Sequence, residues 1–220
     1  MKLFSILSLI KKIPKTSWSS KRPLNIKPKI KTLIFLIIGL FLFGLGETLL
    51  LASGGGVSPW TVLAEGLSIH SSYSIGWCTI LVSFIVLILW IPLKQKPGIG
   101  TILNVIIIAL VFDYTLPYLP NPENYGFKVL QVIIGVLITG LGSGFYLISN
   151  LGPGPRDGLM TGVQRITGKP IALVRSTIEV IVVFFGWKLG GTVGLGTIIF
   201  ALGIGPTVAA GIYFVSKNFK

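Results

Sequence analysis

Six stretches of this 220-residue chain are long and apolar enough, or nearly so, to cross a lipid bilayer as helices. A spanning helix needs about 20 mainly apolar residues. Only 11% of the residues are charged, whereas soluble domains average about 25%, so an ordinary water-soluble globule is excluded. The expected spans cover residues 32–52, 75–93, 99–116, 127–149, 172–189 and 193–215. The predicted fold class is an all-α integral membrane protein with about six transmembrane helices.

The basic residues are distributed unevenly along the chain, and they predict its orientation. The chain has 19 Lys and Arg residues against 6 Asp and Glu residues, which gives a net charge of +13. If the hydrophilic segments alternate between the two sides of the membrane, 17 of these cations lie on one side and two, Lys128 and Lys188, on the other. Basic residues accumulate on the cytoplasmic side. Both termini are therefore predicted to be cytoplasmic.

Residues 1–31 form a predicted basic cytoplasmic segment, and residues 216–220 a short cytoplasmic tail. Residues 3–10 are apolar, but cations and not a small-residue cleavage site follow them, so they are interpreted as an amphipathic foot on the inner leaflet. Two interpretations of the basic charge remain open. It binds anionic lipid, or it is a solvated tail that only sets orientation. No nucleic-acid-binding motif accompanies the charge, so nucleic acid is not an expected partner.

The chain contains an internal duplication with an offset of 96 residues. Residues 39–108 and 135–204 align without gaps and share 19 identities in 70 positions. Many of these are Gly and Pro residues in the same order, which chance does not readily supply. They include the pairs Gly44–Gly140, Gly56–Gly152, Pro59–Pro155, Gly66–Gly162, Gly98–Gly194 and Gly100–Gly196. The predicted units are membrane repeat 1, residues 32–118, and membrane repeat 2, residues 127–215.

Each predicted repeat contains three spans, and this odd number sets the relation between the repeats. After three crossings the chain is on the opposite side of the membrane, so the second repeat enters from that side. The sequence therefore predicts two inverted three-helix repeats. Many secondary transporters have inverted repeats, with binding sites near the repeat interface. Segment 53–74 is then expected outside the cell and its counterpart 149–170 inside.

Two matched loops, residues 53–66 and 149–162, are the candidate binding elements. In each loop a span ends, a Gly-rich turn follows, and a Pro is expected to open a new helix, because Pro suits the first helical position. The free N–H groups and the dipole at such a helix start favour an anion, and Arg156 adds donors. The alternative is a tight turn that redirects the chain, with Arg156 as a topology anchor. The candidate substrate-binding residues are Pro59, Trp60, Gly154, Pro155, Arg156, Asp157 and Gly158.

The run Leu-Gly-Pro-Gly-Pro-Arg-Asp-Gly-Leu-Met-Thr-Gly at residues 151–162 resembles the signature of the bacterial YczE/YyaS/YitT membrane proteins. Pro59-Trp60 and the Gly-Ile-Gly-Thr stretch at 98–101 resemble the YczE branch. Related sequences usually carry an Asp after Pro-Trp, where this chain has Thr61, so the first loop has lost a carboxylate. The resemblance implies a multi-pass protein of the bacterial plasma membrane. It implies no particular reaction.

Ionisable residues inside the expected spans are functional candidates, because a charge at the bilayer centre costs about 2.5–3.5 kcal/mol. Arg175 and Glu179 are one helical turn apart and are interpreted as a structural ion pair. Glu47 and Asp113 lie late in outward-running spans and are candidate ion-coupling residues, with Lys128 and Lys188 as possible partners.

Several classes of function lack the residues that they need. A single Cys and a single His exclude an intrachain disulfide and a two-His metal site, and no metal or cofactor is expected. The Gly-rich loops are followed by no Gly-Lys-Ser/Thr and preceded by no strand, so they are neither phosphate-binding nor dinucleotide-binding motifs. No intramembrane-protease motif is present. No catalytic residue is assigned, and the chain is not expected to be an enzyme.

Two functions fit the predicted architecture. The first is a transporter or exporter of a small solute, of which an anion is one option, with the Pro-opened helices at its gates. The second is a non-transporting accessory or scaffold protein that stabilises a membrane partner. Inverted repeats favour transport, whereas the lack of an evident polar cluster at the membrane midplane favours the accessory role. A hydrated cavity between the two matched loops would discriminate between them.

Overall fold

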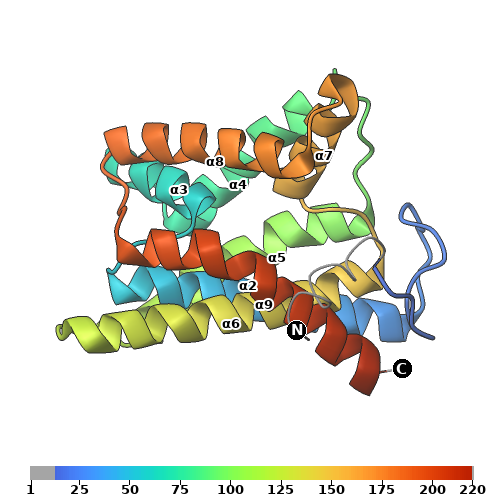
Figure 1. Cartoon of the computed structure of the whole chain (residues 1–220), viewed down its shortest axis with the longest axis horizontal. Helices are drawn as coiled ribbons and strands as arrows, with labels where there is room; N and C mark the ends of the chain where they lie inside the picture. The colour runs from blue at the N-terminus through green and yellow to red at the C-terminus, as the bar shows by residue number, and fades with distance from the viewer. Residues whose placement is uncertain (1–12, 220) are drawn as a thin grey trace.

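The computed structural model describes residues 13–219, so the predicted amphipathic foot at residues 3–10 lies outside the described part of the chain. Within that part the regular structure is helical, without strands (Figure 1). The elements are α2 (Ile30–Ser53), α3 (Pro59–His70), α4 (Ile75–Leu89), α5 (Ile99–Thr115), the 3₁₀ turn η2 (Leu116–Tyr118), α6 (Tyr125–Ser149), α7 (Pro155–Thr167), α8 (Ile171–Lys188) and α9 (Leu195–Asn218). The predicted all-α fold class is confirmed.

The helix boundaries repeat with the 96-residue offset of the sequence. Helices α3, α4 and α5 begin 96 residues before α7, α8 and α9, and α2 ends 96 residues before α6. Each half of the described chain thus contains four α-helices instead of three. The additional helices are α3 and α7, which begin at Pro59 and Pro155 as predicted. They stay separate from the helices that follow because short breaks at 71–74 and 168–170 interrupt them.

The long helices α2 and α6 cross closely and run antiparallel. A Cβ added at Gly46 would lie 2.5 Å from the carbonyl oxygen of Gly135, and one added at Gly142 would lie 2.6 Å from that of Gly39. Contacts this short leave no room for a side chain, so glycine lets the two backbones touch. Gly39 and Gly46 correspond to Gly135 and Gly142 at the 96-residue offset. The crossing is therefore the same when viewed from either helix.

Each half also donates a backbone hydrogen bond to the loop that follows the long helix of the other half. The amide of Gly100, at the start of α5, donates to the carbonyl of Leu151 at 2.8 Å, and the amide of Gly196, at the start of α9, donates to the carbonyl of Gly55 at 2.8 Å. These crossed hydrogen bonds connect equivalent positions of the two halves. They hold the loops 54–58 and 150–154 against the first turn of a helix from the opposite half.

The helices form two layers in Figure 1, with α2, α5, α6 and α9 in one and the shorter α3, α4, α7 and α8 in the other. Helices α2, α6, α9 and α5 with η2 are each long and apolar enough to cross a membrane. Helices α3 and α4 together pass the same test but are bent by 118°, which gives a possible fifth span. Helix α4 has only 15 residues and α8 contains two charged residues in mid-helix, so six separate spans stay a prediction.

The described part of the predicted basic segment packs against the helices. Trp18 is buried among aromatic side chains that include Phe35 and Phe145, and its indole nitrogen donates to the carbonyl of Phe219 at 2.5 Å. The amide of Ser20 donates to the carbonyl of Ser149 at 3.0 Å. The beginning and the end of the described chain therefore meet, next to the end of α6.

Candidate functional site

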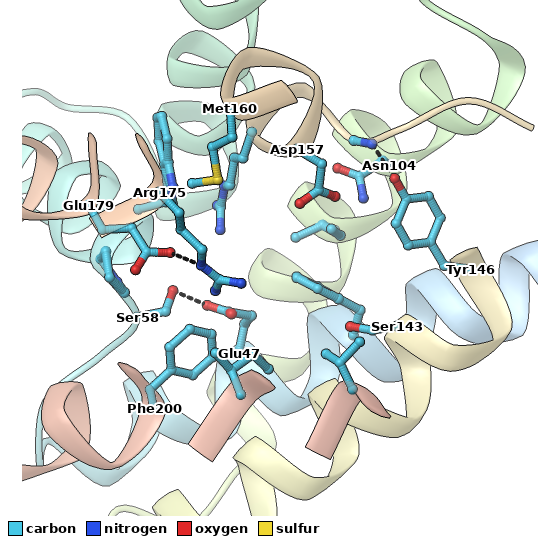
Figure 2. A pocket seen from close by; sticks show the side chains of 18 of the residues that line it. Glu47, Ser58, Asn104, Ser143, Tyr146, Asp157, Met160, Arg175, Glu179 and Phe200 are labelled. Atoms are coloured by element: carbon cyan, nitrogen blue, oxygen red, sulfur yellow. Dashed lines mark hydrogen bonds and ion pairs between the residues drawn. The ribbon is translucent and has the colours of Figure 1, made fainter. Parts of the chain in front are cut away.

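A cavity of about 310 Å³ lies where the two layers face each other. Seven helices, all except α4, contribute side chains to its wall. Figure 2 shows acidic, basic and hydroxyl side chains pointing into it from several of these helices. Three of the six carboxylates of the chain, Glu47, Asp157 and Glu179, line this one cavity. The polar cluster that the sequence did not reveal is thus assembled by tertiary packing.

Glu47 is the most deeply buried charged group at the cavity, with 1% of its surface exposed. Its Oε2 accepts hydrogen bonds from the hydroxyls of Ser58 at 2.5 Å and Thr61 at 2.7 Å. Ser58 precedes α3 and Thr61 lies in its first turn, so the carboxylate of α2 sits at the N-terminus of α3. Its other oxygen, Oε1, has no hydrogen-bond partner among the described residues.

Arg175 and Glu179 face the cavity from α8. The guanidinium of Arg175 donates from Nε to Oε1 of Glu179 at 2.8 Å. This is the pair anticipated from their spacing, and it is the one ion pair found among the described residues. The remaining nitrogens of Arg175 point toward Glu47 in the view of Figure 2. Since both residues line the cavity, the pair contributes to its electrostatics as well as to the helix.

The Pro-opened helices bring Trp60 and Arg156 together. The two residues occupy equivalent positions of α3 and α7, directly after Pro59 and Pro155. The guanidinium carbon of Arg156 lies 5.6 Å from the centroid of the Trp60 ring, within the range of a cation–π contact. The indole nitrogen of Trp60 is buried without a partner among the described residues. The two matched loops thus meet at the cavity wall.

Asp157 faces the cavity from the first turn of α7. Figure 2 shows its carboxylate on the same side of the cavity as Asn104 and Tyr146, away from Glu179. The backbone amide of Gly154 donates to the hydroxyl of Tyr146, so that side chain fixes the start of α7. Asp157 is exposed and contributes to the cavity wall.

The two halves place their carboxylates at different positions of the same framework. Glu47 in α2 corresponds to Ser143 in α6, and Thr61 in α3 corresponds to Asp157 in α7. Of these four residues, Glu47, Ser143 and Asp157 line the cavity, and the Thr61 hydroxyl donates to the Glu47 carboxylate. At these two pairs of positions, each half therefore supplies one carboxylate and one hydroxyl. The carboxylate that the first motif loop lacks at Thr61 is supplied by the long helix of the same half.

Two predicted substrate-binding residues, Pro155 and Gly158, lie outside the cavity wall and contact Trp90. Pro155 accepts a hydrogen bond from the indole of Trp90 at 3.0 Å, and a Cβ at Gly158 would lie 1.9 Å from the Trp90 ring. These two residues make room for Trp90, which directly follows α4. Pro59, Trp60, Gly154, Arg156 and Asp157 do line the cavity.

Asp113, predicted as an ion-coupling residue, lies near the end of α5, and its side chain contacts the start of α4. Its carboxylate accepts from the hydroxyl of Ser74 at 2.7 Å and from the amide of Gly76 at 2.9 Å. It joins the end of α5 to the N-terminus of α4, where a negative charge is favoured, and it is not part of the cavity wall. Lys128 and Lys188 make no ion pair with Glu47 or Asp113 within residues 13–219.

Sequence reasoning missed several residues of the site. Ser58, Asn104, Ser143 and Tyr146 line the cavity and Thr61 bonds Glu47, but none of them is predicted from the sequence as a binding candidate. The 96-residue offset could have found Ser143, because it is the counterpart of Glu47. Tyr146 and Asn104 carry no such signal, because which face of α6 or α5 borders a cavity depends on the packing of the other helices.

The comparisons with known proteins identify the family. The profile of the "Family of unknown function (DUF6198)" matches residues 30–212. The chain belongs to this family. It is 41% identical over 199 residues to a Haemophilus influenzae protein named "Uncharacterized protein", and the match covers 90% of both chains. No solved structure matches the chain.

Two Bacillus subtilis relatives bear out the resemblance of the 151–162 motif. The chain is 32% identical over 170 residues to "Uncharacterized membrane protein YczE", and the match covers 76% of this chain and 79% of the relative. It is 26% identical over 166 residues to "Uncharacterized protein YyaS", covering 74% and 83%. The predicted assignment to the YczE/YyaS group is confirmed. With its apolar helices, the chain is a membrane protein.

Proposed function

We propose that this membrane protein transports a small solute and that the charged cavity is its binding site. One observation carries the proposal: helices α3 and α7, one from each half, start at a shared cavity lined by three carboxylates and two guanidiniums. A buried charged cavity is costly to a membrane protein, and intramembrane ionisable groups commonly mark solute or ion pathways. Its volume lies at the lower end of the range for small-molecule sites, which indicates a small solute.

The path of the chain supports six passes through the membrane. Contacts near Trp18 place the start of α2 and the ends of α6 and α9 at one end of the molecule. The bond from Gly100 to Leu151 adds the start of α5 to that end, and the bond from Gly196 to Gly55 places the start of α9 at the other. Between these ends, we assign the two remaining passes to α3 with α4, which are bent by 118°, and to their counterparts α7 with α8.

Six passes arranged in this way make the halves inverted repeats. Each half passes three times, so the second half starts at the end opposite to the first. The antiparallel crossing of α2 and α6 and the 17-to-2 division of basic residues agree with this arrangement. In the proposed orientation both termini are cytoplasmic, in a bacterial plasma membrane. The cations of residues 13–31, which are exposed, are then placed to meet anionic lipid headgroups.

Thiol labelling tests transport without knowledge of the solute. Asn104 lines the cavity and is half-buried. In a Cys78→Ser background, Asn104→Cys should react with a membrane-impermeant maleimide both in intact cells and in inside-out vesicles, because a transporter exposes its site to each side in turn. Ser83→Cys is the matched control. Ser83 is buried in α4 outside the cavity wall, so it should react from neither side.

The accessory or scaffold role makes a different prediction for the same experiment. A protein that only stabilises a membrane partner has no need to expose its cavity to both sides. Labelling of Asn104→Cys from one side only, or from neither, would therefore reject transport and favour the accessory role. Equal labelling of the Ser83→Cys control would show that the protein had unfolded in the vesicles.

A further inference from the structure

Glu47 has a buried carboxylate oxygen that accepts no hydrogen bond from residues 13–219. The side chain is 1% exposed and lines the cavity. Two hydroxyl donors converge on Oε2, but Oε1 has no partner among the described residues. A buried charge without a complete set of partners is unfavourable. A positively charged group in the cavity would supply the missing partner.

The charges of the cavity wall leave a net negative balance for a ligand to neutralise. Glu47, Asp157 and Glu179 face Arg156 and Arg175. Arg175 is already paired with Glu179 at 2.8 Å, so the groups that remain are two carboxylates and one guanidinium. Before the helix dipoles are counted, the side chains of the wall therefore carry one net negative charge.

The helix starts at the cavity do not reverse this preference. The N-termini of α3 and α7 would by themselves favour an anion, which is the basis of the sequence-derived expectation of an anion site. Each start already has a carboxylate from the chain itself. Glu47 bonds Ser58 and Thr61 at the start of α3, and Asp157 lies in the first turn of α7. These carboxylates offset the positive ends of the two helix dipoles. Oε1 of Glu47 still lacks a hydrogen-bond donor among the described residues, and a cation can supply one whereas a carboxylate cannot.

The apolar part of the wall also suits an organic cation. The aromatic side chains of Phe43, Trp60, Tyr146 and Phe200 line the cavity, and the faces of aromatic rings attract cations. Trp60 already receives the guanidinium of Arg156 on its ring, which shows that this ring accepts a positive group.

We propose that the solute carries a positively charged nitrogen that binds Oε1 of Glu47. The inference rests on the proposed transport function, since it names the class of solute for the same cavity. Arg156 makes no ion pair or hydrogen bond among the described residues, so it is available for a carboxylate if the solute is zwitterionic. An organic cation and a zwitterion thus share the same ammonium contact.

Calorimetric titration of the purified protein in detergent tests this inference with three ligands of equal chain length. The probes are n-butylammonium, 4-aminobutyrate and n-butyrate. We expect n-butylammonium or 4-aminobutyrate to bind and n-butyrate not to bind. Glu47→Gln should weaken the binding by roughly 10- to 100-fold, because it removes a charge-assisted contact. If the zwitterion binds best, Arg156→Gln should remove its advantage over n-butylammonium.

Glu65→Gln is the matched control variant. Glu65 is a carboxylate of α3 outside the cavity wall, and it accepts from the amide and hydroxyl of Thr192 at 2.6 and 2.7 Å. It should leave ligand affinity unchanged even if it lowers stability. Binding of n-butyrate alone, binding by none of the three probes, or equal losses in Glu47→Gln and Glu65→Gln would overturn the inference. The labelling of Asn104→Cys is independent of these probes, so transport can survive the loss of the ammonium assignment.

Discussion

The turn before α3 and the turn before α7 have nearly the same backbone but different side chains at the cavity. Gly54 and Asn150 both end a long helix in the left-handed conformation, with φ of 61° and 52°. Gly56 and Gly152 follow with φ of 112° and 108°. One turn leads into Pro-Trp-Thr and the other into Pro-Arg-Asp. Packing against the opposite half thus fixes the backbone of the turns, whereas the residues that face a cavity are free to differ.

The packing partners behind the two turns differ in a complementary way. Gly186 of the second half meets the backbone of α3 in the first half, where a Cβ would lie 2.6 Å from the Val62 carbonyl carbon. At the equivalent positions, Gly158 of the second half meets the ring of Trp90 in the first half. A position that holds glycine in one contact holds a larger residue in the other. Equivalent contacts can therefore be kept while the individual residues change.

The largest expected effect comes from the glycines that shape both turns. Gly56→Ala and Gly152→Ala should each destabilise the protein by about 4 kcal/mol, the sum of backbone strain and overpacking. A Cβ at Gly56 would lie 2.7 Å from the amide nitrogen of Gly194, and one at Gly152 would lie 2.9 Å from the Cα of Gly98. Thermal unfolding in detergent measures the loss. Gly205→Ala is the control, since nothing lies within 4 Å of its added Cβ; similar values for all three variants would contradict the shared backbone constraint.

The next largest effect concerns the exchanged packing partners. Gly158→Val alone should cost about 3 kcal/mol, because the added side chain overlaps the Trp90 ring. Adding Trp90→Gly copies the Val62–Gly186 contact at both positions and should recover part of the stability, because residues 90 and 158 are in direct contact. A double-mutant cycle of unfolding free energies gives the coupling. Additive losses would show that the two contacts are not equivalent.

A smaller effect is expected when the carboxylate is moved within the first half. Thr61→Asp should cost about 2 kcal/mol, because it places a second negative charge beside Glu47, which Thr61 contacts at 2.7 Å. Adding Glu47→Ser copies the second half, which has Ser143 and Asp157. The double variant should regain stability and part of its n-butylammonium affinity. A double variant less stable than Thr61→Asp would disprove the equivalence of the two halves.

The smallest effect should come from Asn150→Gly, which makes the second turn resemble the first. The side-chain amide of Asn150 donates to the carbonyl of Ser20 at 2.8 Å, a contact without a counterpart at Gly54. Its loss should cost about 1 kcal/mol or less, since glycine tolerates the left-handed conformation. Hydrogen exchange of residues 18–29 should increase. No change in that exchange would mean that Trp18 alone holds the segment.

The sequence predicts the order and the starts of the helices because these depend on the spacing of residues along the chain. The 96-residue offset and the two Pro residues locate the starts of α3 and α7, and the apolar stretches locate the long helices. The membrane environment requires internally satisfied backbones, so these patterns have few alternatives to a helix. The bend that separates α3 from α4 carries a weaker signal, and the expected spans therefore omitted the two short helices.

The cavity could be predicted only in part, because its wall is made by residues far apart in the chain. Trp60, Arg156 and Asp157 were found through their motif, and Glu47 through its cost in a membrane. The partners of Glu47 could not be found, since Ser58 and Thr61 reach it only after α3 folds back on α2. The contacts of Asp113 could not be predicted either, because they join the end of α5 to the start of α4. Its role as an ion-coupling residue stays a prediction.

The meeting of Trp18 and Phe219 has a consequence for the order of the two halves in a gene. Chain ends that lie together allow circular permutation. A chain that joined residue 219 to residue 13 through a short linker and opened at the exposed residues 123 and 124 would begin with α6 and finish with α5. Every helix would keep its neighbours, including the crossed bonds from Gly100 to Leu151 and from Gly196 to Gly55. The fold depends on those crossed contacts, and either half could be translated first.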